Sequence, residues 1–313
     1  MSDNKSILVI IDPTAEQQPA LERSAWLAAQ LGASLELLIC DYDQHLSGGR
    51  FFPSDALEGA QRELLKMHEL RLESLAAPLR EQGLTVGVDA RWEHPLDRGI
   101  LRKAAELQPL IVAKDTHYHS AIKRALFSNA DWSLIHSCAA PLLLVKPRQL
   151  AGSPKILAAV DPLHAHAKPA ELDHAILALA TELATALHGN VEVFHAFDPA
   201  AVIAGATGSI ASPIAVPVRE LTAALEQTHR KALDELLGDY PVQESAVHLQ
   251  QGVAAETLLA LSRKLPADIV IMGAISRSGL RKIFIGNTAE RVLDRLPCDL
   301  LIVKPAGFAI PAP

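Results

Sequence analysis

Short runs of apolar residues alternate along the chain with longer segments in which apolar residues recur every three or four positions. The runs, such as SILVIIDP (6–13) and KILAAVDP (155–162), are too short for helices. Consecutive apolar residues in a short run indicate a strand buried on both faces, as in a parallel sheet. In the long segment 56–82, the residues at helical spacing are Leu64, Leu65, His68, Leu72 and Leu75.

The two halves of the chain repeat one order of elements. SILVIIDP matches KILAAVDP, and PLLLVKP (141–147) matches DLLIVKP (299–305). In the first half the pattern predicts strands at 6–12, 34–41, 85–92, 110–114 and 142–146, and helices at 21–32, 56–82, 96–107 and 130–137. In the second half it predicts strands at 155–160, 191–197, 245–250, 268–272 and 299–303, and helices at 171–187, 218–238, 254–264 and 287–296.

Strands that alternate with helices pair in parallel through right-handed crossovers, with helices on both faces of the sheet. The prediction is an α/β protein with two tandem Rossmann-like domains, each a five-stranded, mainly parallel sheet. The stretch PRQLAGSP (147–154) is rich in Pro, Gly and Ser, which indicates a linker between domains at 1–148 and 149–313. Because the closing strands expose an edge, we expect them to pair with each other as an intramolecular pseudo-dimer.

Composition and charge exclude several classes of function. The 313 residues carry a net charge of −7, which argues against non-specific binding to nucleic acid. The three cysteines include no CxxC pair, which fits a reducing compartment. No signal peptide is visible at the N-terminus, and the run 199–218 is too weakly apolar for membrane insertion. We therefore expect a cytoplasmic protein.

The segment GAISRSGLRKIFIGNTAERV (273–292) lies between the fourth predicted strand and the last helix of the second half. Open parallel sheets bind ligands at this carboxyl edge. A loop that wraps phosphates needs glycines for its tight turns, and a helix start adds free N–H donors. This segment contains glycines, a predicted helix start at Asn287, and side chains with a hydroxyl group or a positive charge. The candidate phosphate-binding residues are Gly273, Arg277, Gly279, Arg281, Lys282, Gly286, Asn287 and Thr288.

The spacing of Gly273, Ser276, Gly286 and Asn287 resembles the G-x₂-G-x₉-G-(S/T) motif of nucleotide-binding universal stress proteins. The text RSGL…GNTAERVL…CDLLIVKP is similar to that family's C-terminal signature, and two fused copies resemble its tandem subgroup, whose domains have the adenine nucleotide alpha hydrolase-like fold. The resemblance implies that the second domain binds an adenine nucleotide, ATP, with Asp161 at the adenine. The implied binding residues are Asp161, Pro162, Gly273, Ser276, Arg277, Gly279, Gly286, Asn287 and Thr288.

Two of these positions depart from the family motif. Ser276 stands where the motif has glycine, which costs on the order of 1 kcal/mol if the site needs positive φ. Asn287 replaces a hydroxyl residue with an amide that can still donate to phosphate. In the first half, Asp115, Tyr118, Ser128 and Asn129 occupy the four motif positions. The Asp115 carboxylate would repel an anion, so we expect the first domain to be a structural partner without nucleotide.

Other chemistry is open at two places in the chain. Asp115, His117 and His119 are candidate ligands for a divalent metal ion, although a polar loop is the simpler interpretation. The long apolar loop 200–217 is a candidate lid or partner surface. No nucleophile–base motif is present, so no catalytic residue is predicted and ATP hydrolysis is at most slow and incidental.

We therefore predict a stress-response regulatory protein that signals by nucleotide occupancy, because a ligand that prefers one state shifts the populations of both. The alternative is a nucleotide-free interaction module, or a carrier of an apolar ligand under the loop 200–217. The expected partners are the small-molecule nucleotide, a second copy of the chain in a homodimer, and a regulatory protein that the sequence does not identify.

Overall fold

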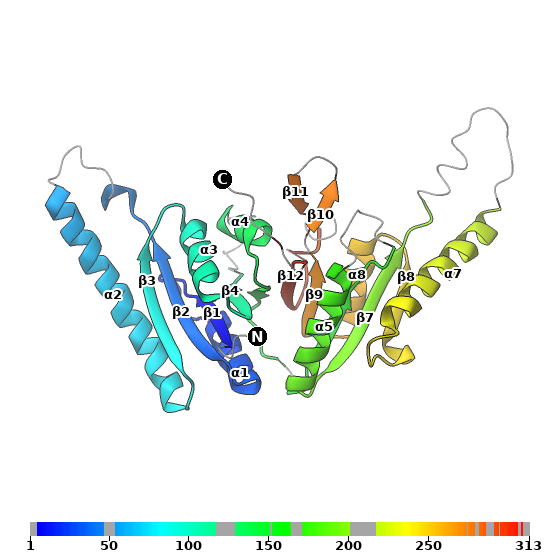
Figure 1. Ribbon diagram of the computed structural model, residues 1–313, viewed down its shortest axis with the longest axis horizontal. Coiled ribbons are helices and arrows are strands. Elements are labelled where there is room, and N and C mark those ends of the chain that lie inside the picture. Colours follow the sequence, from blue (N-terminus) through cyan, green and yellow to red (C-terminus); the bar gives the residue numbers. More distant parts are fainter. Residues whose placement is uncertain are drawn as a thin grey trace. The chain divides into compact units, whose positions relative to one another are not determined.

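The computed structural model divides into two compact units, Met1–Gln149 with Phe308–Pro313, and Leu150–Gly307 (Figure 1). The structure describes residues 5–46, 54–116, 129–150, 152–163, 171–200, 217–273, 275–278, 282–285, 291–293, 295–305 and 308. Each unit contributes five parallel strands and its own helices.

The first unit contains a parallel sheet whose strand order is β3-β2-β1-β4-β5. Its strands are β1 (Ser6–Ile10), β2 (Ser34–Asp41), β3 (Val86–Trp92), β4 (Ile111–Asp115) and β5 (Leu142–Val145). All residues of β1 and β5 are buried, because both faces of the sheet are covered by helices. This burial explains why the sequence shows consecutive apolar residues there instead of strict alternation.

Helices cover both faces of this sheet. They are α1 (Pro19–Leu31), α2 (Ser54–Glu81), α3 (Leu96–Leu107) and α4 (Asn129–Ser137), and a 3-10 turn, η1, spans Gln44–Leu46. Side chains of a strand point alternately to its two faces. On β2, Asp41 contacts His68 of α2 and Glu36 contacts Lys103 of α3, so α2 and α3 lie on opposite faces.

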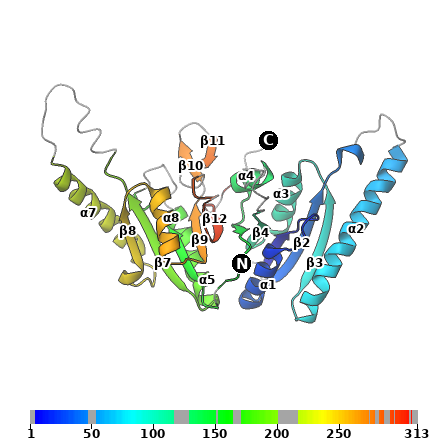
Figure 2. The ribbon, with the colours of Figure 1, turned by 180° about the vertical axis from the view of Figure 1, so that it is seen from behind.

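The second unit repeats this plan with the strand order β12-β9-β6-β7-β8, all in parallel. Its strands are β6 (Lys155–Ala159), β7 (Asn190–Phe197), β8 (Val247–Gln251), β9 (Ile269–Gly273) and β12 (Asp299–Val303). Its described helices are α5 (Glu171–Ala186), α7 (Val218–Leu237) and α8 (Ala254–Lys264), with a 3-10 turn, η2, at Glu244–Ala246. Helix α5 lies in front of the sheet in Figure 1, and α8 lies in front of it in Figure 2, so the two helices cover opposite faces.

These elements confirm the predicted α/β fold with two Rossmann-like, five-stranded parallel sheets. One feature of the second unit differs from the prediction, because residues expected to form an irregular loop pair as an antiparallel hairpin. Its strands are β10 (Ile275–Ser278) and β11 (Lys282–Ile285). Both contain residues of high strand propensity, among them Ile275, Ile283 and Phe284. The pairing of the two closing strands with each other stays a prediction.

None of the described helices is long and apolar enough to cross a membrane.

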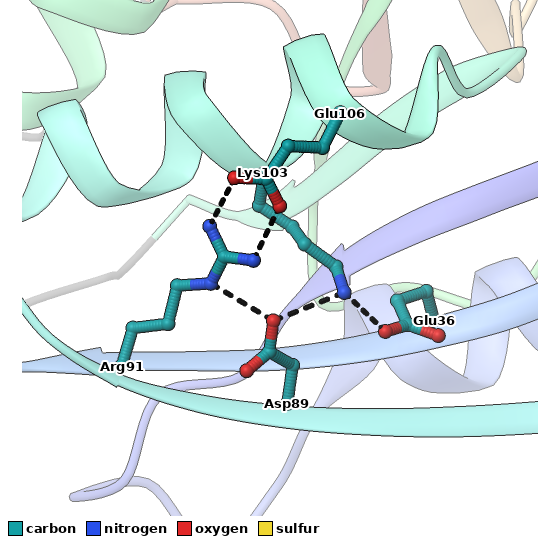
Figure 3. Close-up of polar contacts among 5 residues, drawn as sticks. All are labelled: Glu36, Asp89, Arg91, Lys103 and Glu106. Carbon is teal, nitrogen blue, oxygen red and sulfur yellow. Dashed lines mark hydrogen bonds and ion pairs between the residues drawn. The ribbon is translucent and has the colours of Figure 1, made fainter.

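A network of charged side chains joins α3 to the sheet of the first unit (Figure 3). Lys103 reaches from α3 to Glu36 on β2 and to Asp89 on β3, with its Nζ 3.0 Å from Asp89 Oδ2. Arg91 donates to Asp89 at 2.8 Å and to both oxygens of Glu106. Five charged groups therefore share one partly buried region between the helix and the strands.

Room for this network comes from a glycine in the neighbouring strand. Gly87 is the register partner of Glu36, and a Cβ atom at Gly87 would lie 2.0 Å from Glu36 Oε2. The Glu36 carboxylate thus occupies the space over β3 that a side chain would fill. Burial by itself would lower the pKa of Lys103, but the hydrogen bonds to Glu36 and Asp89 outweigh it and raise that pKa. Lys103 is therefore the cation that compensates Glu36, and it shares Asp89 with Arg91.

Candidate functional site

Asp161 lies at the carboxyl edge of the second sheet, two residues beyond the end of β6. Its backbone N–H donates to Asp173 Oδ1 at 3.0 Å, and Asp173 is a fully buried residue in the first turn of α5. Among the described residues, none donates a hydrogen bond to the Asp161 carboxylate, which is partly exposed. The backbone is thus fixed while the side chain keeps its acceptor oxygens available.

The corresponding aspartate of the first unit is arranged differently. The backbone N–H of Asp12 donates to Gln18 Oε1 at 3.2 Å. Gln18 therefore accepts the backbone hydrogen bond of Asp12, as Asp173 accepts that of Asp161. The Asp12 carboxylate, however, accepts two hydrogen bonds at its Oδ1, from the Thr14 backbone N–H and from Thr14 Oγ1, both at 2.7 Å. The Asp12 carboxylate therefore stabilises the loop to which it belongs.

Gly273 and Asp115 end the fourth strand of their respective sheets, β9 and β4. Gly273 does not form the predicted tight turn, since it pairs with Val303 inside the sheet. A Cβ atom at Gly273 would lie 2.5 Å from Leu172 Cδ2, so any side chain there would have to displace Leu172 of α5. In the first unit, Asp115 is buried and its Oδ1 accepts the backbone N–H of Ala20, in the first turn of α1, at 2.6 Å.

The remaining predicted site residues are divided between described and undescribed positions. Pro162 is partly exposed beside Asp161. Ser276 and Arg277 lie in β10, where they pair with Phe284 and Ile283 of β11. The predicted residues that lie outside the described ones are Gly279, Gly286, Asn287, Thr288, His117, His119 and the loop positions 201–216. No group of three potential metal ligands occurs among the described residues, and of the metal candidates only Asp115 is among them.

A buried pair of histidines, which no motif in the sequence indicated, lies at the same edge of the second unit. His195 is the sixth residue of β7 and 2% exposed, and His229 lies in α7 and is 9% exposed. His195 Nε2 and His229 Nδ1 are 2.7 Å apart. His195 Nδ1 lies 3.1 Å from the carbonyl oxygen of Val160, the residue before Asp161. The pair therefore connects α7 to the end of the strand that carries Asp161.

The contact with Val160 determines which nitrogens carry hydrogen. A carbonyl oxygen only accepts, so His195 Nδ1 must donate to it. In neutral His195 the other nitrogen, Nε2, is then an acceptor, and it takes its hydrogen bond from His229 Nδ1. This leaves Nε2 of neutral His229 as the basic nitrogen of the pair. Burial lowers the pKa of His229, and the negative charge of Asp161 partly opposes that effect.

Comparison with protein families gives one match, which occurs twice along the chain. A model of the universal stress protein family matches residues 3–146 and 153–304. Curated relatives include universal stress protein E from Salmonella typhi, 26% identical over 99% of this chain and 98% of that protein. Universal stress protein E from Escherichia coli K12 is 25% identical over 99% of this chain and 97% of its own length.

Solved structures give the same fold over nearly the whole chain. A functionally unknown protein from Pseudomonas aeruginosa PAO1 is 26% identical and superposes with a TM-score of 0.70, covering 97% of this chain and 93% of that one. A universal stress protein from Archaeoglobus fulgidus is 16% identical with a TM-score of 0.65, covering 97% and 99%. The second likeness concerns the fold alone, and both extend over two consecutive domains.

Proposed function

This chain belongs to the universal stress protein family, and on that premise we propose that its second unit binds an adenine nucleotide, ATP, at the carboxyl edge of its sheet. The family's name places the chain in the stress response. The nucleotide would act by occupancy, favouring the state of the protein that binds it better. The first unit would serve as a structural partner that takes no nucleotide.

The Asp161 carboxylate is the observation that carries this proposal. The exocyclic amino group of adenine is a hydrogen-bond donor, and an ionised carboxylate is a strong acceptor for it. Asp161 has these acceptor oxygens free of hydrogen bonds from described residues, whereas Asp12 uses one of its oxygens for Thr14. The two units share a fold but offer an adenine ring different partners.

The last residues of β9 and β4 support the same division between the units. In the second unit Gly273 places no side chain at the end of β9, which leaves that end without added charge. The residues from 274 to 288 would then supply backbone N–H groups, the Arg277 guanidinium and the Thr288 hydroxyl to the phosphates. In the first unit the equivalent strand ends in the buried carboxylate of Asp115, which disfavours an anion.

Replacing Asp161 with asparagine is expected to weaken ATP binding about tenfold, because the amide is a weaker, uncharged acceptor and can also present its N–H₂ group. The measurement is isothermal titration calorimetry of ATP into the full-length protein. Asp12→Asn is the matched control, since it makes the same chemical change at the equivalent position of the first unit and should leave the affinity unchanged.

Three results of that titration would contradict the proposal. Wild-type protein that gives no heat with millimolar ATP does not bind it. Equal losses of affinity in Asp161→Asn and Asp12→Asn would show that ATP binding is not confined to the site at Asp161 in the second unit. An Asp161→Asn variant with wild-type affinity would remove Asp161 from the site.

A further inference from the structure

We propose that the His195–His229 pair makes nucleotide binding by the second unit proton-linked, so that the pair takes up one proton when the anionic ligand binds beside Asp161. This inference rests on the proposed function and names a regulation of the same site. Binding of the nucleotide would then respond to pH, and the nucleotide would in turn change the protonation of the protein.

The geometry links the pair to the site through one peptide group. His195 Nδ1 donates to the carbonyl oxygen of Val160, and Asp161 is the next residue. His229 donates to His195 from α7 at 2.7 Å. A change of charge on His229 is therefore felt both along this hydrogen-bonded chain and directly by Asp161, whose own charge acts on His229.

The hydrogen-bond pattern accepts one added proton without rearrangement. Nε2 of neutral His229 is the nitrogen that neither hydrogen bond uses, so protonation there produces an imidazolium while both bonds persist. A second proton, on His195 Nε2, would lose the acceptor of the His229 hydrogen bond and place two like charges in contact. The pair is thus limited to the neutral and singly charged forms.

The charges around His229 give the direction of the effect. From β7 it meets His195 and the ring of Phe197, whose centroid is 5.5 Å away, and from the end of β6 it meets the field of Asp161. Among the described residues, Asp161 is the charged group that acts on it. Burial lowers the pKa of His229, so this imidazole is neutral near pH 7 in the absence of ligand. The negative charge of a nucleotide favours the imidazolium and raises that pKa, which draws in a proton.

The first unit provides a natural contrast at the same helix position. His68 of α2 and His229 of α7 each precede by four residues a leucine with no exposed surface, Leu72 and Leu233. His68 Nε2, however, bonds to the carboxylate of Asp41 at 2.7 Å, at the end of β2. The β2 residue that matches His195 is Ile39, the sixth in its strand, which has no imidazole to reach β1. His68 is therefore the matched control.

The test is calorimetry of ATP binding to the full-length protein near pH 6.5, repeated in buffers of different ionisation enthalpy, which gives the number of protons taken up. Wild type, His229→Gln and His68→Gln are compared, because the glutamine amide can still donate to His195 Nε2. ATP itself titrates near this pH, so the decisive quantity is the difference between proteins. We expect proton uptake in wild type and His68→Gln to exceed that in His229→Gln by a measurable fraction of one proton.

Each outcome of this experiment distinguishes the two proposals. Equal proton uptake in wild type and His229→Gln, with ATP still bound, would overturn the proton linkage and leave the proposed function intact. If proton uptake decreased as much in His68→Gln as in His229→Gln, the proposal would also be overturned, because the decrease would not be specific to the His195–His229 pair. No binding of ATP by the wild-type protein would overturn both.

Discussion

Replacing Gly273 with aspartate is expected to abolish ATP binding by the second unit and to destabilise that unit by about 1–3 kcal/mol. The loss of stability follows from packing, since a Cβ atom at this position lies 2.5 Å from Leu172 Cδ2 and 3.1 Å from Leu172 Cγ. The loss of binding follows from charge, since the substitution copies Asp115 of the first unit and places a carboxylate at the end of β9. A carboxylate close to phosphate in a cleft repels it by several kcal/mol.

Two variants separate packing from charge. Gly273→Ala adds the Cβ atom alone, so it should share much of the loss of stability in urea unfolding yet retain more affinity for ATP than Gly273→Asp. Asp115→Gly makes the reverse change in the first unit, removing the acceptor of the Ala20 N–H at a cost of about 1 kcal/mol without creating a second ATP site. Equal affinities of Gly273→Ala and Gly273→Asp would show that charge at this position is irrelevant.

The fold was accessible from the sequence because its signals are local and occur twice. Runs such as 6–13 and 155–162 mark buried parallel strands, and the observed β1 and β6 lie inside them. Aligning the closing strands also placed Asp115 and Gly273 at equivalent positions, as the ends of β4 and β9. The reason for the glycine was not accessible, because it depends on Leu172, which lies about a hundred residues away in the chain.

The histidine pair could not be predicted, because neither member carries a local signal. His195 lies in an apolar strand and His229 in an amphipathic helix, 34 residues apart, and only the fold brings them together. One signal was available in the repeat itself, since His68 and His229 share their spacing to a buried leucine. Comparing the two halves residue by residue would have drawn attention to that helix position, although not to its different partners, Asp41 and His195.

The ion network under α3 shows the same limit of local patterns. Lys103 and Glu36 are 67 residues apart, and their contact depends on the absence of a side chain at Gly87. Lys103 is 13% exposed, Glu36 20% and Asp89 24%, so water screens the three charges only in part. Partly buried charges stabilise the fold only while each is compensated by an opposite charge. Removing one partner leaves an uncompensated charge, which lowers the stability by more than the ion pair had contributed.

We therefore expect Lys103→Met to destabilise the first unit by about 2 kcal/mol, below the 3–5 kcal/mol typical of a fully buried pair because solvent reaches this one. Methionine keeps the length of the side chain but leaves Glu36 without the cation that Lys103 supplies, while Asp89 keeps Arg91 (Figure 3). The measurement is urea unfolding of the full-length protein. Arg98→Met is the control, because Arg98 is 68% exposed and 3.8 Å from Glu93, and its loss should cost less than about 0.5 kcal/mol.

A double variant tests whether the unpaired carboxylate is the cause. If the cost of Lys103→Met is that of a stranded charge on Glu36, then adding Glu36→Gln should recover a large part of the lost stability, because the amide has no charge to compensate. If the cost comes instead from a poorer fit of the methionine side chain between α3 and the sheet, the two substitutions should add, and the double variant should be less stable than Lys103→Met. The sign of that coupling decides whether α3 is held to this sheet by charge or by contact.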